Sequence, residues 1–340
     1  MPNRRQHQRL TVAVIGAGSW GTTVASIAAH NGPTILWARD PELAEEINTQ
    51  RTNARYLGTS RLGRDLRATA SMEEAVGGAD VVVMGVPSHG FRATLEQARP
   101  YVRAWVPIIS LAKGLEQGSL LRMTQVIAEV LPGHPAGVLS GPNLAREIMA
   151  GFAAASVVAM DDETIVCELQ RVFKSPFFRV YTNQDVVGCE VGGALKNVIA
   201  IAAGMGDGLG VGDNTKAAVI TRGLAELTRL GVAMGGQLAT FAGLAGMGDL
   251  VATCASKQSR NRYVGEQLGK GRTIAEINDE MHMVAEGVKT SRVVMELGEK
   301  YGVEMPIARE VYRVVHEGST PAQAYRGLLR VTPGSEQDPG

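Results

Sequence analysis

The chain has 340 residues, and its 34 Lys and Arg are balanced by 34 Asp and Glu, so the formal net charge at pH 7 is zero. A balanced charge gives no global basic field, which excludes a general attraction to nucleic acid and makes any anion site local. Hydrophobic residues make up 45% and charged residues 20% of the chain, as in an ordinary globular protein. At this length we expect about two domains.

The cysteines and the N-terminal residues indicate in which cellular compartment the protein is found. Cys167, Cys189 and Cys254 lie far apart without metal-ligand spacing, which predicts no disulfide framework, no metal site and reduced thiols in the cytoplasm. The basic start, residues 1–9, has no apolar stretch behind it, and no uninterrupted apolar run reaches membrane-spanning length. We expect residues 1–9 and 332–340 to be disordered ends.

The first predicted elements are a strand, a glycine turn and a helix. A β-branched run, Thr11–Ile15, is followed by a glycine-rich loop and by a helical stretch, Thr22–His30. In a dinucleotide-binding turn, Gly16 would permit the tight bend, Gly18 would let the backbone approach a pyrophosphate, and Gly21 would let the helix pack on the strand. An incidental glycine turn is the alternative. The flanking strand and helix favour dinucleotide binding.

The second predicted strand, Thr34–Ala38, ends at Arg39 and Asp40. An acidic residue in this zone usually receives the adenosine ribose of NAD, whereas an arginine can stack on adenine or meet the 2′-phosphate of NADP. Arg39 comes first here, or it is simply a surface arginine. The choice between NAD and NADP therefore stays open.

Further strand-like runs alternate with helical stretches such as Phe91–Tyr101 and Leu120–Leu131. The strands are expected at Leu66–Thr69, Val81–Gly85, Pro107–Leu111, Val138–Leu139, Ala154–Met160 and Phe177–Tyr181. The repeated order of strand and helix predicts an α/β domain with a parallel, doubly wound sheet over residues 10–187.

Two strand ends in this half carry polar groups. Ser88 follows the Val81–Gly85 strand, and Lys113 follows the Pro107–Leu111 strand. Ligands of such sheets bind beyond the carboxyl ends of the strands, so Lys113 is a candidate to place a cation over bound substrate or cofactor. The alternative for Lys113 is a solvated loop lysine.

From about Asp185 onward strand signals vanish and small or apolar residues recur at helical spacing, which predicts an all-α domain over residues 188–331. Its first helix contains Lys196 and Asn197 within a run that is otherwise apolar. Helical geometry places both beside a buried stripe rather than on a solvated face. Desolvation would lower the pKa of Lys196 and suit it to proton transfer near neutral pH; the alternative is a lysine that snorkels to water.

A second polar group follows a glycine-rich segment. Asp249 and Thr253 are four residues apart, hence on one helix face, where they can bind a substrate hydroxyl and a catalytic lysine. Asp249 alone can also be read as a helix cap. Ser259, Arg260 and Asn261 offer three kinds of donor just before a predicted helix, Tyr263–Leu268, which indicates an oxyanion or phosphate site.

Six motifs follow one another along the chain: GAGSWG from Gly16, LAKGLE from Leu111, SGP from Ser140, LKN from Leu195, GLAGMGDLVATC from Gly243 and SRN from Ser259. Together and in this order they resemble the bacterial type of NAD(P)-dependent glycerol-3-phosphate dehydrogenase. The resemblance runs from about residue 10 to 330. It implies a Rossmann-type domain followed by an all-α domain, and the reversible reduction of dihydroxyacetone phosphate to sn-glycerol 3-phosphate, which feeds glycerophospholipid synthesis.

The resemblance also implies roles for single residues. Lys196 matches the family's catalytic lysine, which exchanges a proton with the substrate oxygen, and Lys113 matches a lysine that contacts both cofactor and substrate. The positions that match substrate contacts are Lys113, Gly141, Asn197, Asp249, Thr253, Ser259, Arg260 and Asn261. The positions that match cofactor contacts are Gly16, Gly18, Ser19, Trp20, Gly21, Arg39, Lys113, Ala145, Arg260, Val284 and Glu286.

The chain departs from the family pattern at two positions. Asn143 stands where a threonine or serine usually follows the SGP motif, which puts that substrate contact in doubt, and Arg39 replaces the usual histidine or asparagine. Two other readings remain: a related dehydrogenase of a β-hydroxy acid, and a non-catalytic dinucleotide sensor. The phosphate-type triplet at Ser259 argues against the first, and a buried lysine with Asp249 argues against the second. We expect a cytoplasmic homodimer that acts on a small molecule.

Overall fold

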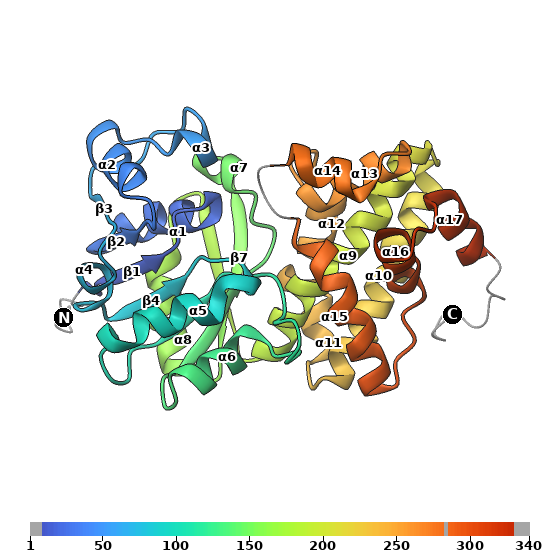
Figure 1. Ribbon diagram of the computed structural model, residues 1–340. Coiled ribbons are helices and arrows are strands. Elements are labelled where there is room, and N and C mark those ends of the chain that lie inside the picture. Colours follow the sequence, from blue (N-terminus) through green and yellow to red (C-terminus); the bar gives the residue numbers. More distant parts are fainter. Residues whose placement is uncertain (1–8, 282–284, 330–340) are drawn as a thin grey trace.

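The computed structural model describes residues 9–281 and 285–329, which form an α/β part followed by a helical part (Figure 1). The α/β part contains one eight-stranded sheet with the order β3-β2-β1-β4-β5-β6-β7-β8. Its strands are β1 Val12–Ile15, β2 Thr34–Trp37, β3 Leu66–Thr69, β4 Val81–Met84, β5 Ile108–Ser110, β6 Ala136–Ser140, β7 Ala154–Met160 and β8 Phe178–Asn183. Strand β1 pairs in parallel with both β2 and β4, so the strand order reverses there.

The two faces of the sheet bury alternate residues of β1. Val12 and Val14 belong to the core on one face, whereas Ala13 and Ile15 belong to the core on the other. The first face is covered by α1 Ser19–Ala29, α2 Pro41–Gln50, the short α3 Ala54–Leu57 and α8 Glu163–Phe173. The second face is covered by α4 Met72–Val76, α5 Ser88–Ala98 and α6 Met123–Val130, and the 3₁₀ turn η1 Arg99–Tyr101 follows α5. Helices on both faces are the mark of a doubly wound fold.

The prediction of a wholly parallel sheet is wrong at one pair of strands. Strand β7 is antiparallel to β6, while β7 and β8 are again parallel. The connection from β6 to β7 contains only α7, Ala145–Met149, whose five residues advance about 7.5 Å. Because so short a helix does not carry the chain back along the sheet, the chain reverses and β7 returns antiparallel.

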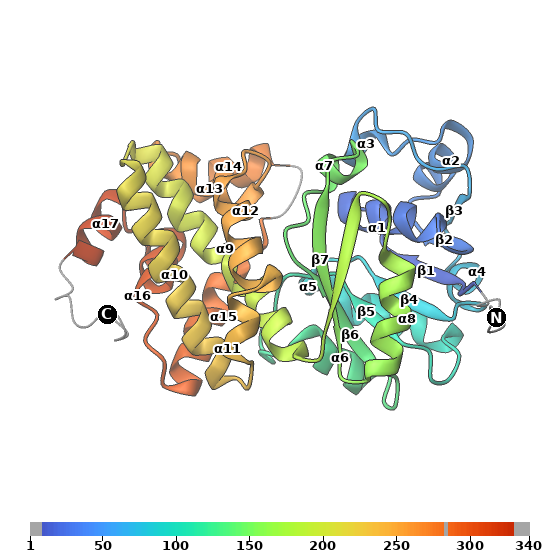
Figure 2. The ribbon, with the colours of Figure 1, turned by 180° about the vertical axis from the view of Figure 1, so that it is seen from behind.

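The helical part is built around α9 Val186–Leu209 (Figure 2). Its other helices are α10 Asp213–Ala233, α11 Leu238–Phe241, the π-helical turn η2 Leu244–Gly248, α12 Asp249–Ala255, α13 Arg260–Gly269, α14 Ile274–Glu280, α15 Glu286–Tyr301, α16 Pro306–His316 and α17 Pro321–Leu329. Helix α13 packs closely on α9, because a Cβ at Gly265 would lie 2.0 Å from the carbonyl oxygen of Ile201.

The boundaries of several helices differ from the sequence expectation. Helix α9 begins at Val186, capped by Asp185, whose carboxylate accepts from the amide of Gly188 at 2.8 Å, so the predicted division at 187/188 falls within its first turn. Helices α1 and α13 both begin three residues earlier than predicted, at Ser19 and Arg260. Among the described residues no strand follows β8.

Two stretches, Val186–Leu209 and Leu238–Ala255, are long and apolar enough to cross a membrane by length and composition alone. The first is α9, of whose most apolar window 94% is buried inside the protein. It is the core helix of the helical part, and its apolar side chains are buried against the surrounding helices. The second stretch is only 44% buried, and it is interrupted by the turn η2.

Candidate active site

The carboxylate of Asp249 joins two lysines that come from different parts of the chain. Lys113 lies in the loop after β5, and its Nζ is 2.6 Å from Oδ2 of Asp249. Lys196 lies on α9, and its Nζ is 3.2 Å from Oδ1. The side chains of Lys113, Lys196 and Asp249 are 15%, 5% and 2% exposed. Two ammonium groups on one carboxylate leave a buried positive charge, and such a site favours an anionic ligand.

Thr253 completes the surroundings of Lys196. Its hydroxyl accepts a hydrogen bond from Nζ of Lys196 at 2.7 Å and lies 2.6 Å from the carbonyl oxygen of Asp249, one turn earlier in α12. Asp249 and Thr253 thus share the helix face that their spacing predicted. Asp249 is the first residue of α12, but its carboxylate binds the lysines and does not cap the helix.

Lys113 is held from a second direction by the carbonyl oxygen of Gly141, which accepts from Nζ at 2.7 Å. Gly141 has a φ of 133°, a conformation that side chains disfavour, and this turn directs its carbonyl group at the lysine. Burial lowers the pKa of Lys113 to about 8, with Asp249 opposing and Lys196 reinforcing the shift. Lys113 therefore sits close to its titration point at physiological pH.

The side-chain amides of two asparagines, Asn197 and Asn261, are hydrogen-bonded to each other. Asn197 donates to the carbonyl oxygen of Lys113 at 2.9 Å, and Asn261 donates to Oδ1 of Asn197 at the same distance. Oδ1 of Asn261 accepts from the amide of Gly287, again at 2.9 Å. This chain of amides ties α9, α13 and the start of α15 to the loop of Lys113, so in this structure Asn197 and Asn261 act on the site by positioning its parts.

The start of α13 lies beside this network. Ser259 caps the helix, since its hydroxyl accepts from the amide of Arg262 at 3.2 Å, while Arg260 in the first turn is exposed. The carboxylate of Glu286 accepts from the amide of Ser88 at 3.3 Å and so joins α15 to the start of α5. Burial raises the pKa of Glu286, although Arg260 and both lysines of the site oppose the shift.

The glycine loop after β1 has the geometry that a bound dinucleotide needs. Gly16 has a φ of 112°, and a Cβ at Gly21 would lie 2.0 Å from the carbonyl oxygen of Gly16, so helix and strand approach too closely for a side chain. Gly18 has no atom within 4 Å of where its Cβ would be, and it leaves the start of α1 without a side-chain cap. The buried Nε1 of Trp20 has no hydrogen-bond partner. This open cradle fits a dinucleotide phosphate.

The remaining candidates for cofactor contact lie on several elements. Ser19 is the first residue of α1, and Arg39 is exposed two residues beyond the end of β2. Ala145 is the first residue of α7, which packs against α1. Val284 lies outside the described residues.

One polar group near the site, Glu190, is absent from the sequence expectation. Glu190, on α9, is buried and accepts from Arg122 at 2.6 Å and from the amide of Thr124 at 2.8 Å, so it anchors the segment between Lys113 and α6. Its signal was present in the sequence, since Glu190 is a second lone charge in the run that contains Lys196. Asn143 donates to Ser156 at 3.2 Å, while its own buried Oδ1 has no partner.

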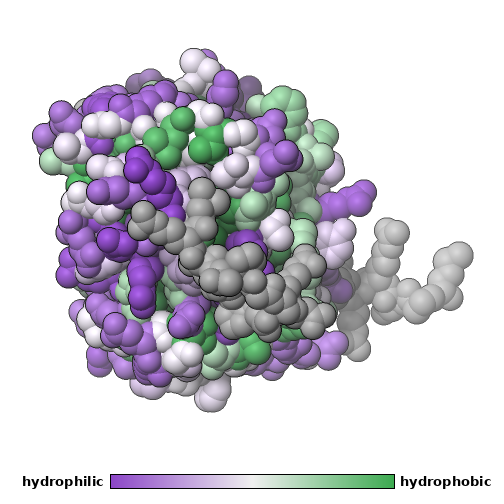
Figure 3. Space-filling view, turned by 90° about the vertical axis from the view of Figure 1, so that its right-hand side faces the viewer, coloured by the Kyte–Doolittle hydropathy of each residue, from purple (hydrophilic) through white to green (hydrophobic). Residues whose placement is uncertain are grey.

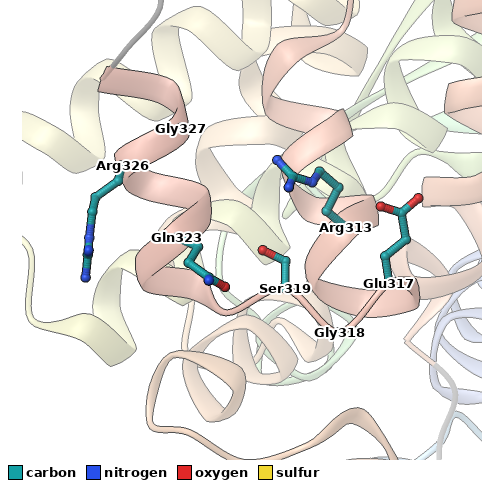
Figure 4. A pocket seen from close by; sticks show the side chains of 7 residues that line it. All are labelled: Arg313, Glu317, Gly318, Ser319, Gln323, Arg326 and Gly327. Carbon is teal, nitrogen blue, oxygen red and sulfur yellow. The ribbon is translucent and has the colours of Figure 1, made fainter.

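A polar hollow of about 500 Å³ lies away from these residues, between α16 and α17 (Figure 4). Arg313 extends from α16, Glu317 directly follows the end of that helix, and Gln323 and Arg326 extend from α17. None of the candidate site residues lines it. Within residues 9–281 and 285–329, no three His, Cys, Asp or Glu side chains lie close enough to share a metal ion.

Comparison with known proteins agrees with this geometry. The family model of the NAD-dependent glycerol-3-phosphate dehydrogenase N-terminus matches residues 11–166, and the model of its C-terminus matches residues 185–326. The chain belongs to the NAD-dependent glycerol-3-phosphate dehydrogenase family. The first model covers the glycine cradle and Lys113, and the second covers Lys196 and Asp249, so the two halves of the site come from the two matched regions.

Relatives in this family are similar over nearly their whole length. The chain is 60% identical over 332 residues to glycerol-3-phosphate dehydrogenase [NAD(P)+] 2 of Sphingopyxis alaskensis, covering 98% of this chain and 100% of the relative. It is 58% identical to glycerol-3-phosphate dehydrogenase [NAD(P)+] 1 of Mycobacterium tuberculosis, covering 96% of each. A crystal structure of glycerol-3-phosphate dehydrogenase from Coxiella burnetii superposes with a TM-score of 0.90 at 36% identity, covering 95% of this chain and 99% of that one.

A more distant solved structure shares the fold alone. A ketopantoate reductase from Ralstonia eutropha matches with a TM-score of 0.59 at 15% identity. The match of the whole chain to glycerol-3-phosphate dehydrogenases identifies this protein as an NAD(P)-dependent oxidoreductase.

Proposed function

We propose that this protein catalyses the reversible reduction of dihydroxyacetone phosphate to sn-glycerol 3-phosphate, with Lys196 exchanging the proton at the substrate oxygen. The observation that carries this proposal is the triad of Lys113, Asp249 and Lys196, in which one carboxylate holds two ammonium groups in a buried site. The reaction needs a proton donor at the ketone oxygen and positive charge near the phosphate, and the two lysines supply both.

Lys196 is held for proton transfer by two neighbours. Asp249 attracts the ammonium group of Lys196, and the hydroxyl of Thr253 accepts a hydrogen bond from Nζ at 2.7 Å. The orientation of Nζ is therefore fixed before substrate binds. In the direction of reduction Nζ gives a proton to the substrate oxygen, and in the reverse direction it takes one back. When bound, the reduced nicotinamide supplies the hydride to the ketone carbon.

The substrate phosphate is proposed to bind at the start of α13, beside Arg260 and Ser259. The first amides of a helix and an arginine together suit a dianion. Burial is the main cause of the low pKa of Lys113 in the free protein, and repulsion from Lys196 adds to it; binding of the phosphate would offset that repulsion.

The cofactor is proposed to bind across the glycine cradle. Gly16, Gly18 and Gly21 shape the turn, the start of α1 takes the pyrophosphate, and Trp20 offers its unpartnered Nε1. Arg39 follows β2 by two residues, in the zone where the adenosine ribose or its 2′-phosphate would lie.

The first test mixes the purified protein with NADH or NADPH and dihydroxyacetone phosphate and follows the loss of absorbance of the reduced cofactor. We expect rapid loss with the phosphate ester and none with unphosphorylated dihydroxyacetone. Comparing wild type with Arg39→Ala for each cofactor determines the role of Arg39. Lys196→Ala should keep cofactor affinity and lose turnover by roughly 100-fold or more; unchanged turnover would remove Lys196 from the chemistry.

The assay also separates the other two readings. Turnover of a β-hydroxy acid, but not of the phosphate ester, would favour the related dehydrogenase. Cofactor binding without turnover of any hydroxy substrate would favour a dinucleotide sensor.

We further propose that the protein works in the cytoplasm as a homodimer and feeds glycerophospholipid synthesis. Its three cysteines are free thiols, which suits a reducing compartment. The reaction product, a glycerol phosphate, is the backbone on which such lipids are built.

A further inference from the structure

Asn53 is a polar side chain that is completely buried, with an exposed fraction of 0%. Hydrophilic side chains are spread over the surface of the protein, as Figure 3 shows for one end of the molecule. A buried amide needs hydrogen bonds inside the protein. Nδ2 of Asn53 donates to the carbonyl oxygen of Ala17 at 2.9 Å and to the hydroxyl of Thr22 at 2.8 Å. Both partners belong to the glycine turn, Ala17 to its loop and Thr22 to the first turn of α1.

The side chain of Asn53 does not cap its own helix. Asn53 is the N-cap of α3, a position where asparagine is favoured because its Oδ1 accepts from an amide of the first turn. Among the described residues the side chain makes no such hydrogen bond, and its buried Oδ1 has no partner. An unpaired buried acceptor destabilises the folded state. The arrangement therefore does not serve the stability of α3, and it favours a role at the glycine turn.

The backbone on both sides of Asn53 is held in place. Oε1 of Glu46, on α2, accepts from the hydroxyl of Thr52 and from the amide of Ala54, both at 2.8 Å. Leu57, at the end of α3, is 3% exposed and belongs to the same core as the buried residues of α1. The amide of Asn53 therefore meets the glycine turn in one fixed position.

We infer that Asn53 positions the peptide group between Ala17 and Gly18 for the phosphates of the dinucleotide, which rests on the cofactor site proposed at the glycine cradle. In a planar trans peptide the carbonyl group and the following N–H point in opposite directions. Because Asn53 binds the carbonyl oxygen of Ala17 from the buried side, the N–H of Gly18 points outward. The loop is open there, since no atom lies within 4 Å of where a Cβ of Gly18 would be. An outward N–H at a helix start can donate to a phosphate oxygen.

The second hydrogen bond of Asn53 joins this loop to α1. The amide of Thr22 donates to the carbonyl oxygen of Gly18 at 2.9 Å, which closes the first turn of the helix. Since one side-chain amide binds both Ala17 and Thr22, it fixes the loop relative to the helix. Asn53 thus acts on the cofactor through the loop, as a positioning residue.

The first test compares Asn53→Ala with Asn48→Ala. Asn48, on α2, also bonds to the backbone twice: it donates to the carbonyl oxygen of Ala68 at 2.8 Å and accepts from the amide of Ala68 at 2.9 Å. Each variant loses two hydrogen bonds, so the free energy of unfolding in urea should fall in both. Only Asn53→Ala should bind NADH and NADPH more weakly, with a dissociation constant at least about tenfold higher in a fluorescence titration without substrate.

Steady-state kinetics separate positioning of the cofactor from the chemistry. In Asn53→Ala we expect KM for the reduced cofactor to rise. At saturating cofactor, kcat and KM for dihydroxyacetone phosphate should stay within about twofold of wild type, because the lysines of the site are untouched.

A second measurement needs no cofactor. Hydrogen–deuterium exchange of the free protein is followed on the peptide that contains residues 16–22. Exchange should be faster in Asn53→Ala, because the first turn of α1 loses its connection to the segment of α3. Asn48→Ala should leave this peptide unchanged and speed exchange in β3, which contains Ala68.

The outcomes decide the inference as follows. If Asn53→Ala binds the cofactor as tightly as wild type, or if its loop exchanges at the wild-type rate, the inference is wrong. Equal weakening by Asn48→Ala would also overturn it, since a general loss of stability would then explain the effect. Circular dichroism checks folding. If Asn53→Ala unfolds, Thr22→Val decides with the same measurements, because it removes the hydroxyl that Asn53 binds and should raise the dissociation constant at least about threefold.

Failure of the inference and failure of the proposed function give different results. If Gly18→Ala weakens cofactor binding and Asn53→Ala does not, only the role of Asn53 is wrong. If neither variant weakens binding, the proposed cofactor site at the cradle is wrong, and the role of Asn53 with it. A protein that binds the cofactor as expected but turns over no dihydroxyacetone phosphate would contradict only the proposed reaction.

Discussion

Replacing Asp249 by asparagine keeps the shape of the side chain and removes the charge that both lysines share. The structure gives the two distances, 2.6 Å to Nζ of Lys113 and 3.2 Å to Nζ of Lys196. At an effective dielectric constant of about 20, these separations correspond to attractions of roughly 6 and 5 kcal/mol. The desolvation of three buried groups offsets most of this attraction.

The net change in stability depends on the two buried lysines, which lose their carboxylate partner when Asp249 is replaced by asparagine. Removing one partner of a buried ion pair costs about 3–5 kcal/mol, and release of the proton from Lys113 limits the loss. We therefore expect the free energy of unfolding of Asp249→Asn to fall by about 3 kcal/mol. Turnover should fall roughly 100-fold, because Lys196 loses the group that orients its ammonium. Burial lowers the pKa of Lys113 to about 8 and Asp249 opposes that shift, so we expect the activity of the wild type to fall as the pH rises through 8 and that of the variant to fall at lower pH.

The assay is the pH dependence of kcat/KM for dihydroxyacetone phosphate, together with urea unfolding. Asp207→Asn is the matched control, because Asp207 also joins two cations, Lys216 at 2.8 Å and Arg262 at 2.7 Å, within the helical part. That variant should lose stability and keep both turnover and the pH profile. If Asp249→Asn keeps the wild-type turnover or the wild-type pH profile, the proposed role of Asp249 is wrong.

Two further predictions concern the cradle and the helical core. Gly18→Ala should fold as stably as wild type, since no atom lies within 4 Å of the new Cβ, yet it should bind NAD(P)H at least about tenfold more weakly in a fluorescence titration. Gly90→Ala, where the new Cβ also meets no atom within 4 Å, is the control. If Gly18→Ala binds the cofactor as tightly as wild type, the glycine loop is not the phosphate site. Burial raises the pKa of Glu226 to about 7, so its contribution to stability is complete below about pH 4.5 and is lost as the pH rises through 7. Between pH 5 and 8 the free energy of unfolding of wild type should therefore fall by up to about 3 kcal/mol relative to Glu226→Gln, measured in urea; parallel curves would contradict this.

Local patterns were enough to predict most elements of the fold. The strands at Leu66–Thr69 and Ala154–Met160 were predicted with the boundaries that the structure has, because β-branched and apolar runs bounded by turn residues specify a buried strand locally. The antiparallel direction of β7 was not predicted. It depends on how far a five-residue helix can carry the chain, which a pattern of alternating elements does not express.

The early starts of α1 and α13 have a related cause. Gly18 and Ser259 are the caps, and the first turn of each helix consists of residues that the sequence assigned to a loop or a binding triplet. A residue can be both a helix start and a candidate anion contact, so its type alone does not tell the two apart.

The sequence by itself determined the order of the elements, the glycine turn, and the lone charges Lys196 and Asp249, because these features depend on residues that are near neighbours in the chain. Only the tertiary structure decided which charges meet. Lys113 and Asp249 are 136 residues apart, and they meet because folding brings the loop after β5 next to the start of α12. The same holds for the amide chain from Asn197 to Gly287, since its members come from elements that are far apart in the chain.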